Sequence, residues 1–236
     1  MTYLSATEPE FVVGTTSGYA PYVSLDGEGR YEGFDIDFAN ALAQKLGQKL
    51  VIKDLGSMPS LMLALQQNKI DALIWAVSIT PERTQKMRMI YYQGDKVTQM
   101  PFLFWKKAPK EIRSIDDLKG RTVSVEALSF QESVLKKYPD TQLKQVEKIS
   151  DGIMEIRFGK SFATMIDPSL VAKWTAQNPN LQVVWLPLKP DEYALGNGIC
   201  IHKNKSDLAA RIEAATEKLI QEGKVLELEQ KWGLRN

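Results

Sequence analysis

The chain has 236 residues, of which 44% are hydrophobic and 25% are charged, with 15 glycines and 11 prolines. This composition is typical of an ordinary globular protein and excludes a disordered or fibrous one. Lysine and arginine number 30 against 29 acidic residues, so the formal net charge of +1 provides no global field to attract nucleic acid or an anionic membrane. We therefore expect no nucleic-acid partner, and any charge selectivity must be local.

Neither a membrane span nor an export signal is visible in the chain. The longest apolar runs, residues 72–77 and 102–105, are far shorter than the roughly 20 residues that cross a bilayer. Residues 1–10 lack the charged and apolar regions of a signal peptide, which leaves a cytosolic protein or a mature form whose signal peptide has been removed. The single cysteine, Cys200, excludes an internal disulfide and does not indicate a compartment.

The first part of the chain alternates predicted strands and helices. Apolar residues at Phe34, Phe38, Leu42 and Leu46 predict an amphipathic helix that ends at Gly47. Thr80 and Pro81 are typical of an N-cap and a first helical residue. The remaining elements expected here are strands at residues 11–15, 50–52 and 72–77 and a helix at residues 59–67.

A second α/β unit follows the basic stretch at residues 106–110. We expect its strands at residues 122–125, 142–146 and 163–166, and its helices at residues 129–138, 149–158 and 168–177. Within residues 91–105 and 181–201, two extended stretches follow one another without an intervening helix, which suits chain crossings between two lobes. Residues 205–232 are predicted to form a helix with one apolar face.

Few residues could perform catalysis or hold a metal ion. His202 is the only histidine, and nucleophilic pairs of the Ser-His or Cys-His kind require one beside the nucleophile. Cys200 and His202 lie two residues apart, but two ligands do not make a zinc site, and we interpret both as packing residues. Because phosphate-binding glycine motifs are also missing, we expect no metal and no cofactor. Paired carboxylates remain open as acid catalysts.

The most informative segment is residues 72–83. A buried strand that ends near Val77 and a helix that begins at Thr80 place Ser78 at the carboxyl end of a strand, where open α/β sheets bind ligands. Arg83 falls in the first helical turn, where the helix dipole disfavours a cation unless an anion is present. A ligand carboxylate would supply that anion. The alternative is that Arg83 points to solvent or pairs with Glu82.

Three further positions could contact a ligand at strand ends. Ser129 begins a capping-box pattern that presents helix-terminal amides after a strand, although it could equally be a plain cap. Asp167 follows a predicted strand, where it could cap a helix or bind an ammonium group. Tyr19 and Trp75 could hold a cation or an apolar side chain against their rings, and core packing is the alternative for Trp75.

The order of these motifs resembles the polar amino-acid family of periplasmic solute-binding proteins. The resemblance is carried by residues 13–22, 33–37, 69–72, 78–83, 114–123 and 220–224. It implies an α/β protein with the two-lobed periplasmic-binding-protein type II fold, in which each lobe is a mainly parallel sheet flanked by helices and two hinge crossings join the lobes. The expected segments are residues 1–96 for the first part of lobe 1, 97–192 for lobe 2, and 193–236 for the return segment and C-terminal helices of lobe 1.

The resemblance also implies a site for one amino acid between the lobes. Arg83, with Ser78 and the amides around Ser129, would bind the α-carboxylate, while Asp167 and the carbonyl of Ala76 would bind the α-ammonium. Other positions would line or approach the side-chain pocket. The full implied set is Tyr19, Asp35, Met58, Trp75, Ala76, Ser78, Arg83, Ser129, Phe130 and Asp167.

Among possible ligands, L-arginine is favoured by overall similarity. Tyr19 and Trp75 could enclose a planar guanidinium, with Asp35 or Glu126 nearby. Against arginine, relatives that bind basic amino acids often carry an acid in the first loop, where this chain has Thr16. Two more departures from the family pattern are the bulky segment 75–78 and residues 128–130, where Phe130 offers only its backbone amide. Glutamine or another polar amino acid therefore stays open.

The first interpretation is a monomeric, extracytoplasmic binding protein without catalytic activity that delivers an amino acid to the membrane permease of an ABC transporter. It would be periplasmic or tethered by a lipid on an N-terminal segment that this chain lacks. The second is a dehydratase-like enzyme on the same fold, with Glu126 as its acid. The third is a signalling or adhesion module that uses the same clamp to recruit a partner.

Overall fold

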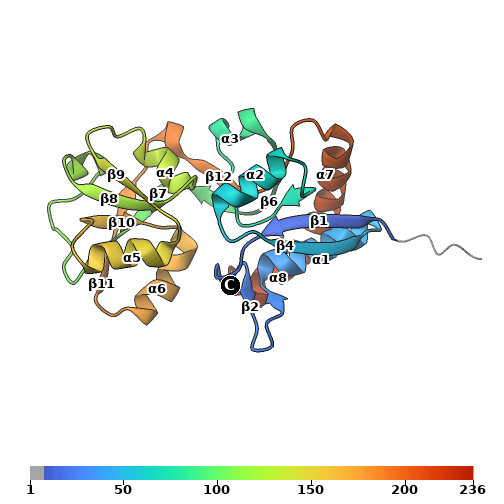
Figure 1. Ribbon diagram of the computed structural model, residues 1–236, viewed down its shortest axis with the longest axis horizontal. Coiled ribbons are helices and arrows are strands. Elements are labelled where there is room, and N and C mark those ends of the chain that lie inside the picture. The colour runs from blue at the N-terminus through green and yellow to red at the C-terminus, as the bar shows by residue number, and fades with distance from the viewer. Residues whose placement is uncertain (1–7, 236) are drawn as a thin grey trace, which may run out of the picture. The chain divides into compact units, whose positions relative to one another are not determined.

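The computed structural model describes residues 8–235; the expectation for the N-terminal segment falls largely on residues outside that range. The described chain forms two compact units. Unit 1 takes in the chain up to Gly56, Ser60–Gly94 and the chain from Gly196 onward, and unit 2 takes in Ser57–Pro59 and Asp95–Leu195. Each unit is a five-stranded sheet with helices (Figure 1), so the predicted α/β class is confirmed.

The sheet of unit 1 has the strand order β4-β1-β5-β12-β6. These strands are β1 (Glu10–Thr15), β4 (Lys49–Asp54), β5 (Ala72–Leu73), β6 (Arg88–Val97) and β12 (Ala194–Ile201). β1 is parallel to both of its neighbours, whereas β12 is antiparallel to β5. The sheet is therefore mixed, with its parallel strands on one side. A separate hairpin joins β2 (Ser24–Leu25) to β3 (Tyr31–Glu32).

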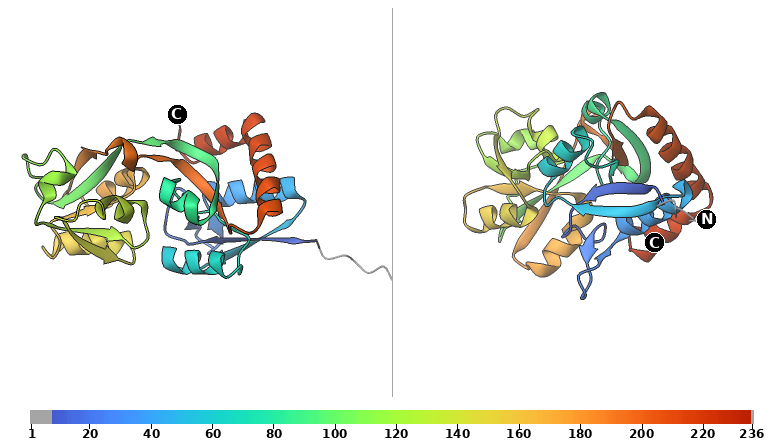
Figure 2. Two further views of the ribbon diagram at one scale, coloured as in Figure 1. Left: turned by 90° about the horizontal axis from the view of Figure 1, so that it is seen from above. Right: turned by 45° about the vertical axis from the view of Figure 1, so that its right-hand side comes forward.

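Helices cover this sheet on both faces: α1 and α2 lie on opposite sides of β1 (Figures 1 and 2). The helices of unit 1 are α1 (Phe34–Leu46), α2 (Met58–Gln66), α3 (Pro81–Lys86), α7 (Ser206–Gln221) and α8 (Lys224–Lys231). α1, α7 and α8 pack on one another. In the core, Phe38 of α1 lies 4.7 Å from the Tyr92 ring of β6, measured between ring centroids. The helix that apolar spacing predicts after Gly33 thus buries its apolar face as expected.

The sheet of unit 2 has the strand order β11-β7-β10-β8-β9. Its strands are β7 (Gln99–Trp105), β8 (Thr122–Glu126), β9 (Gln142–Val146), β10 (Ala163–Met165) and β11 (Leu181–Pro187). β8 is parallel to β9 and β10, while β7 is antiparallel to β10 and β11. Both sheets are therefore mixed rather than mainly parallel as expected. The helices are α4 (Phe130–Leu135), α5 (Ile149–Arg157) and α6 (Val171–Gln177), with 3₁₀ turns η1 (Ile115–Leu118), η2 (Pro168–Leu170) and η3 (Pro190–Glu192).

Four predicted elements differ in the structure. The strand expected at residues 72–77 ends as β5 at Leu73, because the backbone turns at Ala76, whose φ is 46°. The helix expected at residues 205–232 is two helices, since Gly223 takes a left-handed conformation with φ 75°. The helix expected at residues 129–138 ends at Leu135, and that expected at 168–177 begins as the turn η2.

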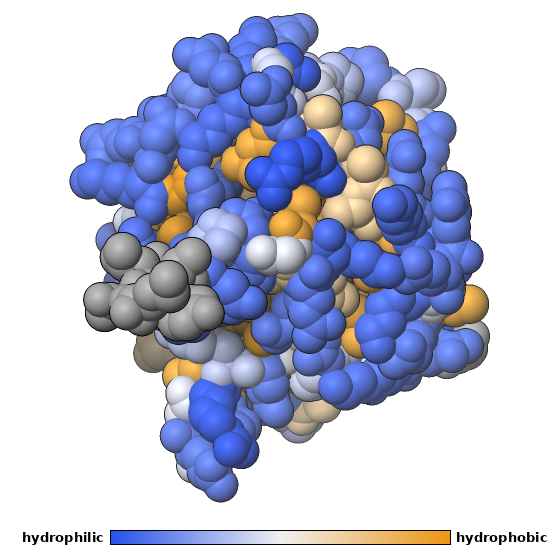
Figure 3. Space-filling view, turned by 90° about the vertical axis from the view of Figure 1, so that its right-hand side faces the viewer, coloured by the Kyte–Doolittle hydropathy of each residue, from blue (hydrophilic) through white to orange (hydrophobic). Residues whose placement is uncertain are grey.

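Among the described helices, none combines the length and the apolar character that crossing a bilayer requires. The face in Figure 3 is covered mostly by hydrophilic residues, with hydrophobic residues scattered among them.

Candidate functional site

The loop between β5 and α3 is held from both sides within unit 1. The Ile74 amide donates to the Gly14 carbonyl at 3.1 Å, which continues the pairing with β1 one residue beyond β5. On the other side, Ser78 forms an isolated bridge with Asn197 of β12. The Val77 carbonyl accepts from the Gly198 amide at 2.8 Å. The loop therefore has a fixed path although it is not a regular strand.

Arg83 lies buried at the end of this loop. Thr80 caps α3, with its Oγ1 accepting from the Arg83 amide at 3.2 Å, and Pro81 is the first helical residue, as predicted. The Arg83 side chain is only 9% exposed, and its Nη1 donates to the Ser78 carbonyl at 2.8 Å. Burial lowers the pKa of the guanidinium, and the nearby Cys200 and Glu82 oppose that shift. The solvent-facing alternative for Arg83 is thus wrong.

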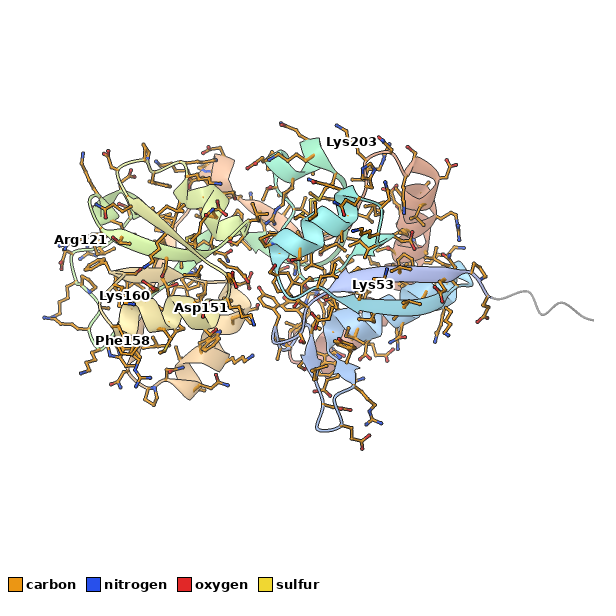
Figure 4. All side chains as sticks on the ribbon, viewed as in Figure 1. Lys53, Arg121, Asp151, Phe158, Lys160 and Lys203 are labelled. Atoms are coloured by element: carbon orange, nitrogen blue, oxygen red, sulfur yellow. The ribbon has the colours of Figure 1, made fainter. Side chains whose placement is uncertain are left out.

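Arg83 differs in this respect from basic residues elsewhere on the chain. Lys53, Arg121, Lys160 and Lys203, labelled in Figure 4, are exposed. A buried guanidinium presents a planar fork of N–H donors that matches a carboxylate. Removing it from water costs free energy that an anionic partner can offset. Arg83 at the start of α3 can therefore act as an anchor for a ligand carboxylate.

Asp35 lies beneath the same loop. Its side chain is 1% exposed, with Oδ1 accepting from the Tyr92 hydroxyl at 2.7 Å and Oδ2 accepting from the Ala76 amide at 2.9 Å. Burial raises the pKa of Asp35 to about 7, and the two hydrogen bonds act in the opposite direction. Each carboxylate oxygen of the predicted site residue Asp35 therefore accepts a hydrogen bond from another group of the protein.

Tyr19 and Trp75 lie against one another. Their ring centroids are 5.1 Å apart at an interplanar angle of 50°. A guanidinium between two rings needs roughly 7 Å, two van der Waals separations of about 3.5 Å, so the expected enclosure is not formed in this arrangement. Trp75 is 6% exposed, and its indole Nε1 is buried without a hydrogen-bond acceptor among the described residues.

An acid that the sequence analysis missed lies beside the first loop. Asp54 ends β4, directly opposite Thr15 in the parallel register with β1. Its Oδ1 accepts from Thr16 Oγ1 and its Oδ2 from the Ser17 amide, each at 2.9 Å. Burial opposes these hydrogen bonds, but together they hold the pKa of Asp54 below its ordinary value. Position 16 is a threonine and not an acid, but its side chain is hydrogen-bonded to the Asp54 carboxylate.

In unit 2, the start of α4 follows the predicted cap with one difference. Ser129 Oγ accepts from the Glu132 amide at 3.0 Å. The Glu132 carboxylate accepts from the Leu128 amide rather than from that of Ser129, because the Ser129 amide donates to the Glu126 carbonyl at 3.3 Å. Ser129 and Phe130 are buried at this helix start.

Glu126 and Asp167 share one edge of the unit 2 sheet. Glu126 ends β8 and Asp167 follows β10, and these strands are parallel neighbours. Burial raises the pKa of Glu126 to about 7, and the negative charge of Asp167 adds to that shift. Asp167 Oδ1 also caps η2 by accepting from the Ser169 amide at 2.9 Å. Two neighbouring carboxyl groups suit a cation such as an ammonium or guanidinium group.

The predicted site residues therefore fall into two sets, one in each unit. Unit 1 holds Tyr19, Asp35, Trp75, Ala76, Ser78 and Arg83, and unit 2 holds Met58, Ser129, Phe130 and Asp167. Met58 is buried and begins α2, whose residues from Ser60 onward belong to unit 1. No group of three or more His, Cys, Asp or Glu side chains within residues 8–235 is arranged to hold a metal ion.

The family match and the similar proteins both consist of solute-binding proteins. Residues 11–235 match the model of the family described as bacterial extracellular solute-binding proteins, family 3. The probable ABC transporter arginine-binding protein ArtJ of Chlamydia trachomatis is 34% identical, with 96% of this chain and 87% of that protein aligned.

Solved structures agree with this match. The arginine-, lysine-, histidine-binding protein ArtJ of Geobacillus stearothermophilus has a TM-score of 0.81 and 28% identity, and the alignment covers 96% of both chains. An ancestral arginine-binding protein bound to glutamine has a TM-score of 0.80 and 29% identity, over 96% of this chain and 99% of that one. These similarities confirm the expected periplasmic-binding-protein fold.

Proposed function

Since the chain belongs to family 3 of the bacterial extracellular solute-binding proteins, we propose that it captures a free amino acid, L-arginine first, for an ABC transporter. The observation that carries this proposal is the buried Arg83, held on the Ser78 carbonyl at the start of α3. Similarity to proteins named for arginine binding supports the choice of ligand. The family consists of solute-binding proteins, so the dehydratase alternative with Glu126 as its acid gains no support.

We assign residues from both sets to each end of the ligand. The guanidinium of Arg83 and the hydroxyl of Ser78 would bind the α-carboxylate, with the amides at Ser129 and Phe130. Asp167 would bind the α-ammonium together with the Ala76 carbonyl. Each pairing joins opposite charges or a donor to an acceptor, as a zwitterion requires.

Glutamine is a second candidate ligand. The contact between Tyr19 and Trp75 leaves no room for a guanidinium between their rings, and a similar ancestral protein has been solved with glutamine bound. The acids Glu126 and Asp54, in contrast, favour a cationic side chain. The two ligands differ in charge, so a direct comparison distinguishes them.

The test is a thermal melt of protein that has been unfolded, dialysed and refolded to remove carried ligand, against each of the twenty amino acids. At roughly 100-fold excess over Kd, binding adds about 2.7 kcal/mol, a shift on the order of 5 to 10 °C for a chain of this size. A shift with arginine supports the full proposal, and a shift with glutamine alone retains the function but changes the ligand. No shift with any amino acid contradicts the function.

The finer parts of the proposal concern location and partners. We propose a monomer that works in the periplasm, or on a membrane through an N-terminal lipid, and docks onto the permease of its transporter. Light scattering after gel filtration checks the monomer, and a dimer mass would overturn it. Co-purification of the arginine-loaded chain with membranes that contain the permease checks the partner.

A further inference from the structure

Ala76 has a backbone conformation that its side chain does not favour. Its φ of 46° lies in the left-handed region, where the Cβ of an L-residue approaches the following carbonyl oxygen. Alanine also lacks the polar side chain with which asparagine or aspartate can stabilise this conformation. The conformation must therefore be maintained by contacts from elsewhere in unit 1.

The contact made by Ala76 itself comes from Asp35. The Ala76 amide donates to Asp35 Oδ2 at 2.9 Å across 41 residues of sequence. The flanking residues are held as well, Ile74 by the carbonyl of Gly14 and Val77 by the amide of Gly198. The contacts of Ile74 and Val77 are ordinary strand-like backbone pairings. The hydrogen bond from the Ala76 amide to Asp35 is therefore the contact made by the left-handed residue itself.

The carboxylate of Asp35 is itself held in place. The Asp35 amide donates to the Tyr22 carbonyl at 3.0 Å, which fixes the first turn of α1. Oδ1 accepts from the Tyr92 hydroxyl at 2.7 Å. The Tyr92 ring packs against Phe38, 4.7 Å away between ring centroids. A buried carboxyl group with two donors in fixed positions can hold a backbone amide without moving.

We propose that Asp35 is a positioning residue for ligand binding, which fixes the left-handed turn at Ala76 and thereby the direction of the Ala76 carbonyl and the path of the chain to Ser78. Asp35 acts through this turn and does not touch the ligand. The inference rests on the proposed function, in which the Ala76 carbonyl and Ser78 are ligand contacts. It replaces the direct ligand contact expected for Asp35 from the family resemblance.

The test separates the contact with Ala76 from the contact with Tyr92. Asp35→Leu removes the acceptors for both. Asp35→Asn keeps an acceptor for the Ala76 amide, and its NH₂ group can donate to the Tyr92 oxygen. Tyr92→Phe is the matched control, because it removes a hydrogen bond to the same carboxylate and leaves Asp35 Oδ2 as the acceptor for the Ala76 amide. Each variant is titrated with L-arginine by calorimetry, and its thermal midpoint is measured.

We expect Asp35→Leu to weaken arginine binding by about a hundredfold, because the Ala76 amide loses its acceptor and the Ala76 carbonyl and Ser78 are then no longer held in the positions that bind the ligand. Asp35→Asn and Tyr92→Phe should stay within about threefold of the original affinity, although Tyr92→Phe lowers the thermal midpoint. A folded Asp35→Leu variant with unchanged affinity would overturn the proposal. Equal losses in Tyr92→Phe and Asp35→Leu would also overturn it, since the effect would then be one of general stability.

A spectroscopic measurement decides the matter if Asp35→Leu does not fold. The amide resonance of Ala76 should shift as the Asp35 carboxyl titrates with a pKa of about 7, and this shift should vanish in Asp35→Asn. The groups acting on this titration are the Tyr92 hydroxyl and the Ala76 amide, with Tyr22 beside Tyr92. An Ala76 resonance that ignores pH would overturn the proposal. Original protein that binds no amino acid would instead overturn the proposed function.

Discussion

Arg83 is a cation in a place where both the helix dipole and burial oppose its charge. It lies in the first turn of α3 and is almost fully buried. The Ser78 carbonyl offsets part of that cost, because a carbonyl oxygen stabilises a guanidinium by accepting from it. An arrangement of this kind gains most when a carboxylate arrives, which is why the proposed function centres on this residue.

Replacing Arg83 should therefore affect binding far more than folding. Arg83→Ala is expected to cost several kcal/mol of amino-acid affinity, since the ligand carboxylate would be left without its charged partner. Arg83→Lys should also bind weakly, because lysine lacks the planar fork of donors. Calorimetric titration with arginine measures both variants. Arg88→Ala, which removes an exposed arginine that donates to the Lys203 carbonyl, is the control and should bind normally.

The buried acids make the stability of the chain depend on pH. The pKa of Asp35 rises from 3.8 to about 7 and that of Glu126 from 4.5 to about 7. At a pH between its ordinary pKa and its raised pKa, each of these carboxyl groups is protonated in the folded state and ionised in the unfolded state. The free energy of unfolding contributed by these groups should therefore fall as pH rises from about 5 through about 7 and then level off.

The double variant Asp35→Asn with Glu126→Gln tests this dependence, since neither amide titrates. Urea denaturation at about pH 5 and about pH 8 should show a loss of stability in the original chain that is much smaller in the double variant. Identical pH dependence in the two proteins would show that other groups are responsible.

Among the helices and strands, short sequence patterns predicted correctly the features that depend on contacts between residues close together in the chain. The amphipathic α1 with its closing Gly47 and the Thr80 cap depend on neighbours within a few residues. The turn at Ala76 depends on Asp35 and on β12, which are far away in the sequence. The continuous apolar run at residues 72–77 predicted a strand to residue 77, whereas β5 ends at Leu73 and a loop follows.

The candidate site was predictable to a similar degree. The cap at Ser129 and the acids Glu126 and Asp167 follow from strand ends, because the carboxyl ends of parallel strands meet at one sheet edge. Asp54 could have been found by the same rule, since β4 ends beside β1. The hydrogen bonds to the two oxygens of Asp35 could not have been predicted, because its partner Tyr92 lies on a strand 57 residues away.

In the whole molecule, apart from the short segment Ser57–Pro59, the chain passes from one unit to the other within β6 and within β12. Each passage has a glycine with positive φ, 89° at Gly94 and 81° at Gly196. A Cβ on Gly196 would lie 2.7 Å from the Gly94 carbonyl oxygen. Because that neighbour is backbone, the two passages have to shift if residue 196 gains a side chain.

Gly196→Ala should therefore destabilise the protein by more than the roughly 1–2 kcal/mol that a left-handed alanine costs on its own. Gly223→Ala is the matched control, since Gly223 has a similar φ of 75° but an added Cβ would meet nothing within 4 Å. Thermal unfolding of the two variants provides the comparison. Equal losses of stability would show that the close approach of Gly94 to Gly196 has no energetic consequence.

The most direct test of amino-acid capture through Arg83 is calorimetric titration of the refolded, ligand-free protein with L-arginine, together with its Arg83→Ala variant. We expect saturable one-to-one binding to the original chain and a loss of about a hundredfold or more in the variant, equivalent to several kcal/mol. Equal affinity in the two proteins, or no binding of any amino acid by the original chain, would contradict capture through Arg83.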